Sequence, residues 1–473
     1  MTAGEADSTA AGTALRGDAV PEPGHRTPGI GARWFLSFGA LWLVVWMAQL
    51  TPTQLLLPQQ VRTGSADAGG SGWTGGVIAF GLIFSAVGLL ALVSAPVIGR
   101  LSDRRSGRRR RPFLVGGVVL ASVGMVALGL QTTTPGVLLG WLAVSLGIVA
   151  ASTAATAVVA DQVPAARRGV ASGVIGATQA VGLILGVALC VLLVLTVQGG
   201  YWLLAALLLV VGLAGALLLP DPPADGVDEA VTVTDTADET DGPAPTGGDV
   251  VTADPATHTG TLSRATRATR AAVTGARDIA ARLREQRPLR LVLGWTALVN
   301  TGNALATGLL LFFLVDGLGI EETGANDQLL AVIAVYTVFV VLASFVGGWI
   351  SDRWGRRRPL VAATAGLQLI AAVLIVLVPS VGGLTVAAAL LGLSYGGFSS
   401  VNLALVVDVL PDRQTVARDM SLVQIAQNGP QTVAPVIGAL VVAATGGFTA
   451  LFVVTGLLSV AAMLVVGRLR GVR

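Results

Sequence analysis

The chain has 473 residues, of which 53% are hydrophobic and 12% are charged, and its mean hydropathy is +0.76. A soluble globular protein carries about 25% charged residues, so this composition excludes a chain whose whole surface faces water and indicates that apolar side chains face lipid. The net charge of +3 and the pI near 9.7 are compatible with nucleic-acid binding, but the placement of the arginines along the chain argues against it.

Residues 1–33 are polar and rich in Ala, Gly and Pro, which predicts a disordered tail without the apolar stretch of a signal peptide. A bilayer core about 30 Å thick needs about 20 apolar residues in a helix. Twelve runs of about this length follow, and each is predicted to cross the membrane: 34–57, 74–98, 113–131, 136–158, 169–196, 200–219, 291–315, 328–350, 359–379, 383–407, 419–443 and 447–467.

Residues 220–290 separate the sixth run from the seventh. Their first part, 221–259, is acidic and rich in Thr, Pro and Gly, which predicts a flexible linker. The second part, 261–290, is basic and is a helix candidate. Such a helix would lie along the inner membrane surface, where anionic lipid attracts arginine; a solvated basic linker is the alternative.

The arginines indicate the orientation of the spans. The turns after the second, fourth, sixth, eighth and tenth runs, together with both tails (1–33 and 468–473), hold every arginine except Arg62. Basic loops stay on the cytoplasmic side, so both termini are predicted to be cytoplasmic, in agreement with an even number of spans. All basic residues are arginine, which is typical of a GC-rich genome, and we expect a multi-pass protein of a bacterial plasma membrane.

One arginine-rich turn occurs twice. "APVIGRLSDRRSGRRRRPFLV" (95–115) has a partner in "SFVGGWISDRWGRRRPLV" (344–361), and Asp103 aligns with Asp352 at an offset of 249. A second pair of segments, one at the end of each half's fourth run, keeps an offset of 247 because the first loop is two residues longer: "VVADQVP" (158–164) and "LVVDVLP" (405–411). The register predicts two six-span halves of the same topology, 34–219 and 291–467, with a substrate site between them at the bilayer midplane.

The repeated pattern G-x-x-x-D-R-x-G-R-R resembles the signature loop of the major facilitator superfamily. The matching residues are Gly99, Asp103, Arg104, Gly107, Arg108 and Arg109 in the first copy, and Gly348, Asp352, Arg353, Gly355, Arg356 and Arg357 in the second. The resemblance implies an all-α membrane protein with twelve transmembrane helices in two six-helix bundles, acting as a secondary active transporter by alternating access. "SDRRSGRRRRPF", "QAVGLILG" (179–186) and "QIAQNGPQ" (424–431) further resemble segments of the sucrose:proton symporter and related glycoside carriers.

A carboxylate at a helix end is costly near lipid unless it is paired or accepts backbone N–H groups at a helix N-terminus. In the superfamily the loop Asp contacts the start of the eleventh span, and a loop Arg pairs with an acid at the end of the fourth. Carried over, Asp103 would meet residues 419–421 and Arg108 or Arg109 would reach Asp161. In the second half, Asp352 would meet the start of the fifth span, and Arg356 or Arg357 would reach Asp408.

These contacts would hold the cytoplasmic side closed and break when it opens; the alternative is that the arginines serve topology alone. Arg110 and Arg111 are expected to serve topology or to contact lipid. We expect Asp103→Asn to reduce transport while insertion and abundance stay intact. Normal transport rates of this variant in reconstituted vesicles would rule out the gating role.

Polar residues within the predicted spans recur at helical spacing and face either a cavity or a neighbouring helix. Amides bridge vicinal hydroxyls and flat rings stack on the apolar face of a sugar, so together they predict a site for a neutral polyhydroxylated ligand. Interhelical hydrogen bonding is the alternative for each. The candidates are Trp42, Trp46, Gln49, Thr53, Asn300, Asn303, Tyr395, Asn402, Gln424, Gln427, Asn428 and Gln431, to which the resemblance adds Gln179.

Proton symport needs a titratable group in the cavity. Aligning "VVAD" (158–161) on the carrier motif puts Ser145 where the sucrose:proton symporters have a carboxylate, and no acid or histidine lies deep within a run. Asp316, at the outer end of the seventh run, is the candidate for coupling. The alternative to sugar uptake is proton-coupled efflux of drugs or amphipathic metabolites.

No enzyme, metal or cofactor chemistry is predicted. The two histidines lie in polar segments, the single cysteine, Cys190, lies in an apolar run, and no Walker loop occurs. The expected partners are a small-molecule substrate, membrane lipid and a proton as the coupling ion, with no nucleic acid, and the expected state is a monomer.

Overall fold

The computed structural model of the chain describes residues 31–67, 72–105, 110–164, 167–220, 286–354, 357–409 and 416–468. Within these ranges every regular element is a helix. The N-terminal half contains α1 (Ala32–Thr51), η1 (Pro52–Leu56), α2 (Leu57–Asp67), α3 (Gly72–Arg105), α4 (Arg111–Gly129), α5 (Thr134–Gln162), α6 (Arg168–Leu192), α7 (Val197–Leu207), η3 (Leu208–Gly212) and α8 (Leu213–Leu218). The C-terminal half contains α10 (Arg287–Gly308), α11 (Leu310–Phe312), η5 (Phe313–Gly317), α12 (Glu322–Trp354), α13 (Arg357–Leu377), α14 (Val381–Val409), α15 (Val416–Thr445) and α16 (Thr449–Gly467).

These helices form the predicted membrane spans. Ten of the described helices are long and apolar enough to cross a membrane, or eleven if the bent pair of α10 with α11 and η5 is one span. α15 is 30 residues long and is the remaining helix in the order of the twelve predicted runs; its amides and two internal prolines lower its hydropathy. The prediction of an all-α membrane protein is confirmed. The N-terminal tail, the linker up to residue 285 and most of the basic helix candidate lie outside the described residues.

Two boundaries differ from the predicted ones. The first span continues from Ala32 to Gly64, so Arg62 lies within a helix rather than in a turn. The polar side chains after Leu57 find hydrogen-bond partners within the protein, so the helix continues. The Gln60 amide donates to the carbonyls of Leu128 and Gln131, at the turn between α4 and α5, at 2.8 Å each. At the other boundary, α10 begins at Arg287 instead of residue 291.

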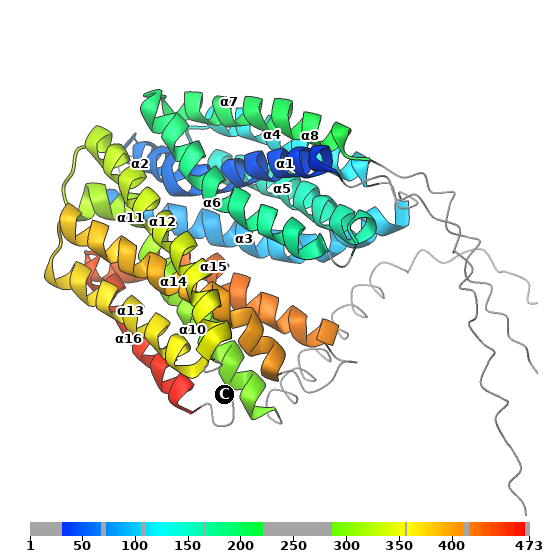
Figure 1. The fold of residues 1–473 in the computed structure, drawn as a ribbon. Coiled ribbons are helices and arrows are strands. Elements are labelled where there is room, and N and C mark those ends of the chain that lie inside the picture. Colours follow the sequence, from blue (N-terminus) through cyan, green and yellow to red (C-terminus); the bar gives the residue numbers. More distant parts are fainter. Residues whose placement is uncertain are drawn as a thin grey trace, which may run out of the picture.

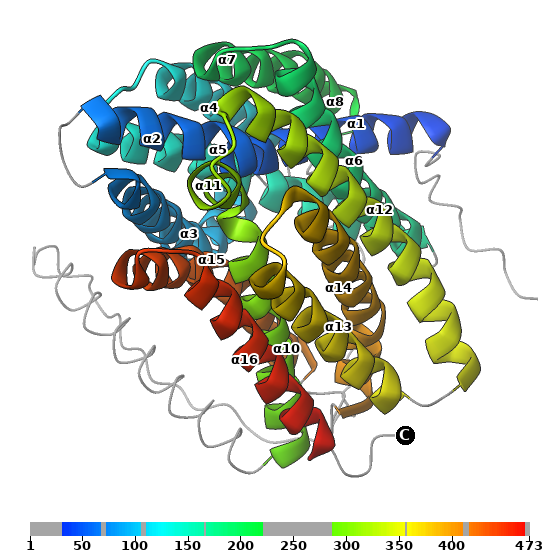
Figure 2. The same ribbon diagram turned by 90° about the vertical axis from the view of Figure 1, so that its left-hand side faces the viewer.

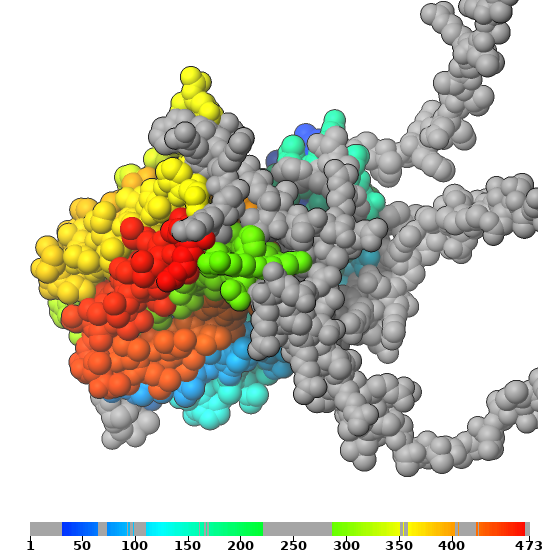
Figure 3. All heavy atoms as spheres, turned by 90° about the horizontal axis from the view of Figure 1, so that it is seen from below, coloured from blue at the N-terminus to red at the C-terminus, as the bar shows by residue number. Residues whose placement is uncertain are grey.

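The two halves pack as two bundles, the first drawn from blue to green and the second from yellow-green to red (Figure 1). Between them, α3 packs against α15 and α12 packs against α6, and both crossings are visible in the turned view (Figure 2). The second span of each half therefore meets the fifth span of the other, as the predicted parallel repeat requires. On the molecular surface the orange α15 abuts the blue α3 (Figure 3).

The two ends of the assembly differ in charge and in packing. One end, the basic end, carries the described arginines of the even-numbered turns, among them Arg110, Arg167 and Arg353. Among the described residues, the larger apolar cluster fills the N-terminal half and continues into the C-terminal half mainly through residues toward the opposite end, such as Phe312 and Phe448. A smaller cluster around Trp295 and Phe398 fills the C-terminal half near the basic end. Continuous apolar packing between the halves thus lies opposite the basic end.

Close helix contacts within a half depend on glycine. At the α4–α5 crossing, a Cβ on Gly117 would lie 2.6 Å from the Ala151 nitrogen and 2.7 Å from the Gly147 oxygen, whereas a Cβ on the preceding Gly116 would meet no atom within 4 Å. Backbone atoms cannot move aside independently, so the helices would have to separate.

We therefore expect Gly117→Ala to destabilise the protein by about 1–3 kcal/mol. Gly116→Ala is the matched control and should stabilise it slightly, by up to about 1 kcal/mol, because alanine favours helix. Thermal unfolding of the two purified variants in detergent measures the difference. Equal stabilities would contradict the close approach of α4 and α5.

Candidate functional site

A cavity of about 320 Å³ lies between the two halves. Its wall comes from α1, η1, α3 and α6 on one side and from α10, α11, α12, α14 and α15 on the other. The volume falls within the range of small-molecule sites. The position matches the predicted site between two parallel repeats.

The wall is apolar with polar groups at a few places. Nine of the 27 lining residues are polar: Thr53, Gln54, Gln179, Asn303, Thr307, Tyr336, Thr337, Tyr395 and Gln431. Among these 27 residues there is no Asp, Glu, Arg or His. A charged ligand would thus find no opposite charge here, and the cost of desolvating its charge would remain uncompensated.

Two pairs of polar side chains meet across the C-terminal half of the wall. The Tyr336 hydroxyl donates to Asn303 Oδ1 at 3.3 Å, which links α12 to α10. Tyr395 of α14 and Gln431 of α15 lie close together in the same wall. A bound hydroxyl compound would exchange hydrogen bonds with these pairs, since each amide keeps further donor or acceptor capacity.

Aromatic rings complete the wall on the N-terminal side. Phe80 and Phe84, one turn apart on α3, line the cavity with ring centroids 5.9 Å apart. Phe80 also meets Phe312 of the other half at 5.6 Å. These rings offer flat apolar surfaces of the kind that pack against the apolar face of a sugar or against an amphipathic compound.

Five of the predicted binding residues line this cavity: Thr53, Gln179, Asn303, Tyr395 and Gln431. The two tryptophans do not. Trp42 is buried in the larger apolar cluster and Trp46 packs against it. Gly182 allows this packing, because a Cβ on it would lie 3.1 Å from the Trp46 Cβ. The two tryptophans therefore pack within the protein and not at the cavity wall.

The remaining candidates also stand apart from the cavity wall. Asn300 is buried and donates to the Thr296 carbonyl at 2.9 Å, while Asn402 Oδ1 accepts from Thr296 Oγ1 at 2.8 Å. For Asn402 the alternative of interhelical hydrogen bonding describes what the structure shows, whereas Asn300 bonds within its own helix, α10. Gln49 and Gln427 are half-buried and Asn428 is exposed, and the Gln424 side chain lies outside the described part of the structure.

Sequence reasoning missed several lining residues, chiefly Gln54, Tyr336, Phe80 and Phe84. Gln54 lies in the π-helical turn η1, Pro52–Leu56, one residue after the predicted Thr53. Tyr336 had a readable signal, because a tyrosine in the middle of an apolar run needs a partner for its hydroxyl. The phenylalanines had none, since lipid-facing and cavity-facing rings look alike in sequence.

Among the described residues, the faces that line the cavity become exposed toward the basic end. Along α14 and α15 the lining face continues in that direction to Ser399 and Asn428, both exposed, and along α6 it continues to Gly173, where a Cβ would meet no atom within 4 Å. In the opposite direction the lining faces of α3 and α15 run into Val77 and Ala439, both fully buried. The structure is thus sealed at the end away from the arginine-rich loops.

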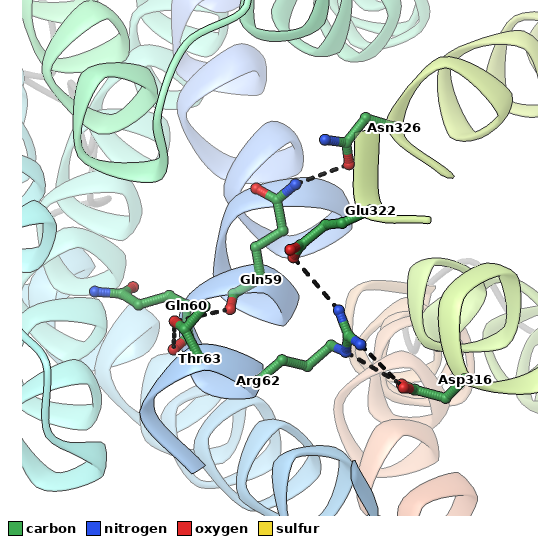
Figure 4. A network of polar contacts seen from close by, with 7 residues as sticks. All are labelled: Gln59, Gln60, Arg62, Thr63, Asp316, Glu322 and Asn326. Carbon is green, nitrogen blue, oxygen red and sulfur yellow. Dashed lines mark hydrogen bonds and ion pairs between the residues drawn. The ribbon is translucent and has the colours of Figure 1, made fainter. Parts of the chain in front are cut away.

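Asp316 lies at this sealed end and not in the cavity. Its carboxylate accepts from Arg62 of the N-terminal half, with Nη2–Oδ1 at 3.0 Å (Figure 4). The side chain of Asp316 is 7% exposed. A buried carboxylate that bridges the two halves is consistent with the predicted position near the outside, and its partner could not be read from the sequence.

At the basic end, Asp161 pairs with an arginine of the first signature loop, with Arg110 Nε at 3.0 Å. The neighbouring Arg111 donates through Nη2 to the carbonyls of Leu217 at 2.6 Å and Leu219 at 3.0 Å. Both arginines, which were expected to serve topology or to contact lipid, also bind protein groups near the ends of α5 and α8.

The other signature residues give less structural information. Arg353 is exposed and lies over the Trp349 ring, 5.6 Å from its centroid. Gly99 and Gly348 lie within α3 and α12, and a Cβ on Gly348 would meet no atom within 4 Å. The side chains of Asp103, Arg104, Asp352, Arg357 and Asp408, and the whole of Gly107, Arg108, Arg109, Gly355 and Arg356, lie outside the described part of the structure.

The fold and the doubled signature loop agree with a comparison against protein families. The model of the Major Facilitator Superfamily matches residues 70–325 and matches again at 296–473. The chain belongs to this superfamily. It is therefore a multi-pass membrane protein and a secondary transporter of small molecules, and the family prediction is confirmed at this level.

Solved structures of other superfamily members share the fold. The nucleoside transporter NupG is 12% identical with a TM-score of 0.66, covering 92% of this chain and 98% of its own. A D-xylose-proton symporter is 15% identical with a TM-score of 0.64, covering 92% and 97%. A bacterial homologue of the human lysosomal transporter Spinster, solved inward-facing and unoccupied, is 15% identical with a TM-score of 0.61, covering 92% and 95%. No curated protein matches the sequence.

Proposed function

We propose that this superfamily member takes up a neutral polyhydroxylated solute, a sugar or glycoside, together with protons. The observation that carries the proposal is the chemistry of the cavity wall, with amides at Gln54, Gln179, Asn303 and Gln431 and no charged residue among those that line it. Amides offer a donor and an acceptor side by side, which suits vicinal hydroxyls. The apolar remainder of the wall suits the carbon face of a sugar ring.

The two halves provide alternating access. Arginine-rich loops stay on the cytoplasmic side, so the basic end is the cytoplasmic end of a bacterial plasma membrane protein with both termini inside. On this assignment the cavity opens inward, and uptake ends in this state. Return to the outward-open state requires the halves to separate at the opposite end, around a cavity that both halves line.

For coupling, Asp316 is the candidate, since no titratable carboxylate or imidazole lines the cavity among its described residues. Its pairing with Arg62 means that a proton reaches the carboxylate only after this pair opens. We expect Asp316→Asn to lose the stimulation of uptake by a proton gradient. Solute counterflow without a gradient would be retained, and the ratio of the two rates in proteoliposomes measures the effect.

Efflux of amphipathic compounds is the second candidate. It is favoured by the apolar majority of the wall, 18 of 27 residues, which includes Phe80 and Phe84. Efflux carriers need apolar surface and few fixed hydrogen bonds, whereas a sugar carrier needs its amides. The two functions therefore differ in which side chains matter.

The deciding experiment uses the purified full-length protein in proteoliposomes. Labelled neutral sugars, glycosides and nucleosides are offered with and without an acidic exterior, beside a sugar acid as the charged control and empty liposomes as the blank. Uptake of a neutral compound, faster with the acidic exterior and not shared by the sugar acid, is expected. Failure of every neutral compound together with gradient-driven export of an amphipathic dye would replace uptake by efflux.

A further inference from the structure

The sealed end of the molecule contains a charge cluster that joins the two halves. Arg62 lies near the end of the first span, on α2. Asp316 lies in η5 at the end of the seventh span, and Glu322 begins α12, the eighth. We propose that these three residues form an ionic latch that holds the extracellular side of the transporter closed.

Arg62 and Asp316 form a bidentate pair. Arg62 donates through Nη2 to Asp316 Oδ1 at 3.0 Å and through Nε to Oδ2 at 3.2 Å, so that both carboxylate oxygens are held (Figure 4). A third group, Nη1, reaches Glu322 Oε1 at 3.4 Å. A bidentate arginine–carboxylate pair is stronger and more directional than a single hydrogen bond. The pair is also shielded, with 20% of the Arg62 side chain and 7% of the Asp316 side chain exposed.

A second contact runs parallel to the latch. Gln59 lies three residues before Arg62 on the same helix and donates to Asn326 Oδ1 at 2.8 Å (Figure 4). Asn326 is one turn after Glu322 on α12, so the two helices are joined at two successive levels. Beside them, the rings of Trp73 and Phe448 stack with centroids 5.5 Å apart. All of these contacts join the N-terminal half to the C-terminal half.

The sequence supplies an independent reason. Arg62 is the one arginine that stands outside the cytoplasmic loops and tails, and an arginine on the outer side works against the charge rule that orients the spans. Both of its carboxylate partners belong to the other half. When the halves separate at this end, Arg62 leaves with the first half and the carboxylates stay with the second. The pairs can exist only while the outer side is closed.

The test measures access to the cavity from outside and needs no substrate, so its outcome is independent of the proposed sugar uptake. A cysteine is placed in the cavity by Gln54→Cys in a Cys190→Ala background. Right-side-out vesicles are then treated with a membrane-impermeant maleimide, and the labelling rate is followed. Arg62→Gln and Asp316→Asn should each raise the rate about fivefold, the factor that corresponds to about 1 kcal/mol.

The double variant shows whether the two residues act through each other. If they form one latch, Arg62→Gln with Asp316→Asn labels about as fast as either single variant, because the shared interaction is already lost. Multiplied effects of about 25-fold, or unchanged labelling in both single variants, would overturn the proposal.

Two matched controls are available on the same elements. Arg33→Gln removes an exposed arginine at the other end of the first span, and Glu321→Gln removes an exposed acid next to Glu322; neither should change the labelling rate. If Arg62→Gln does not reach the membrane, Arg62→Lys replaces it. Lysine keeps the positive charge but cannot bind the carboxylate bidentately, so the expected rise in the labelling rate is smaller, about twofold. A labelling rate equal to that of the parent protein contradicts the latch.

Discussion

Asn303→Leu is expected to lower transport efficiency by roughly 5- to 150-fold, equal to about 1–3 kcal/mol of lost interaction. Asn303 faces the cavity from α10 and accepts the Tyr336 hydroxyl at 3.3 Å. Leucine has a similar size but neither donor nor acceptor. The substitution removes one amide from the ligand and leaves the Tyr336 hydroxyl without its acceptor, which is costly when the site is closed around a solute.

The measurement is the initial rate of uptake against concentration for the solute identified in proteoliposomes. Thr301→Val is the matched control, since Thr301 lies on the same helix, bonds its own backbone at Ala297 and is not part of the wall. It should transport normally. An equal loss of transport in both variants would show that α10 is merely destabilised. Normal transport by Asn303→Leu would show that the Asn303 amide does not bind the solute.

Gly81→Val is expected to reduce transport to near background by preventing closure of the outer side. A Cβ on Gly81 of α3 would lie 2.7 Å from the Ala439 Cβ and 2.8 Å from the Pro435 carbonyl oxygen on α15. The α3–α15 crossing joins the two halves, and the obstructing atoms are short or belong to the backbone. They cannot turn aside, so the halves must remain apart at this level and the cycle stops.

A graded series on α3 checks this result. Gly88→Ala should cause a smaller loss, because the three atoms nearest to its Cβ all belong to the Thr432 side chain, with Cγ2 at 2.7 Å, and a side chain can shift more readily than backbone. Leu82→Phe enlarges an exposed neighbour of Gly81, 53% accessible, and should leave transport intact. The Gln54→Cys reporter should label quickly from outside in Gly81→Val. Slow labelling together with lost transport would mean that the crossing blocks the cycle in some other way.

The organisation of the chain could be predicted because the bilayer imposes simple rules. Backbone N–H and C=O groups inside the bilayer must be hydrogen-bonded within the protein, which a helix achieves by itself. A helix needs about 20 apolar residues to cross the bilayer core. The doubled "SDR" loop then indicates the repeat. Its consequence appears in the structure as paired crossings of α3 with α15 and of α12 with α6. The resemblance to the superfamily that the sequence shows rests on the same two features, and the match of the family model agrees with it.

The site could be predicted only in part because polarity does not say what a side chain faces. Asn303 and Asn402 are both amides within apolar runs, yet the first lines the cavity and the second bonds Thr296 across to α10. Trp46 and Thr53 belong to one helical stripe in sequence, but only Thr53 reaches the cavity. Thr53 and Gln54 both lie in the π-helical turn η1, and no residue pattern in this chain indicated that turn.

The sequence by itself determined the helical class, the order of the spans, the duplication and which loops are basic. These features follow from the free-energy cost of exposing polar backbone and charge to lipid. That cost constrains each span and each loop separately, so it shows in the local sequence. The pairing of Arg62 with Asp316, the partner of Asp161 and the end at which the cavity is sealed were decided only by the tertiary structure. They depend on how helices far apart in sequence pack, 51 residues apart for Arg110 with Asp161 and 254 for Arg62 with Asp316, and such contacts leave no periodic trace in either segment.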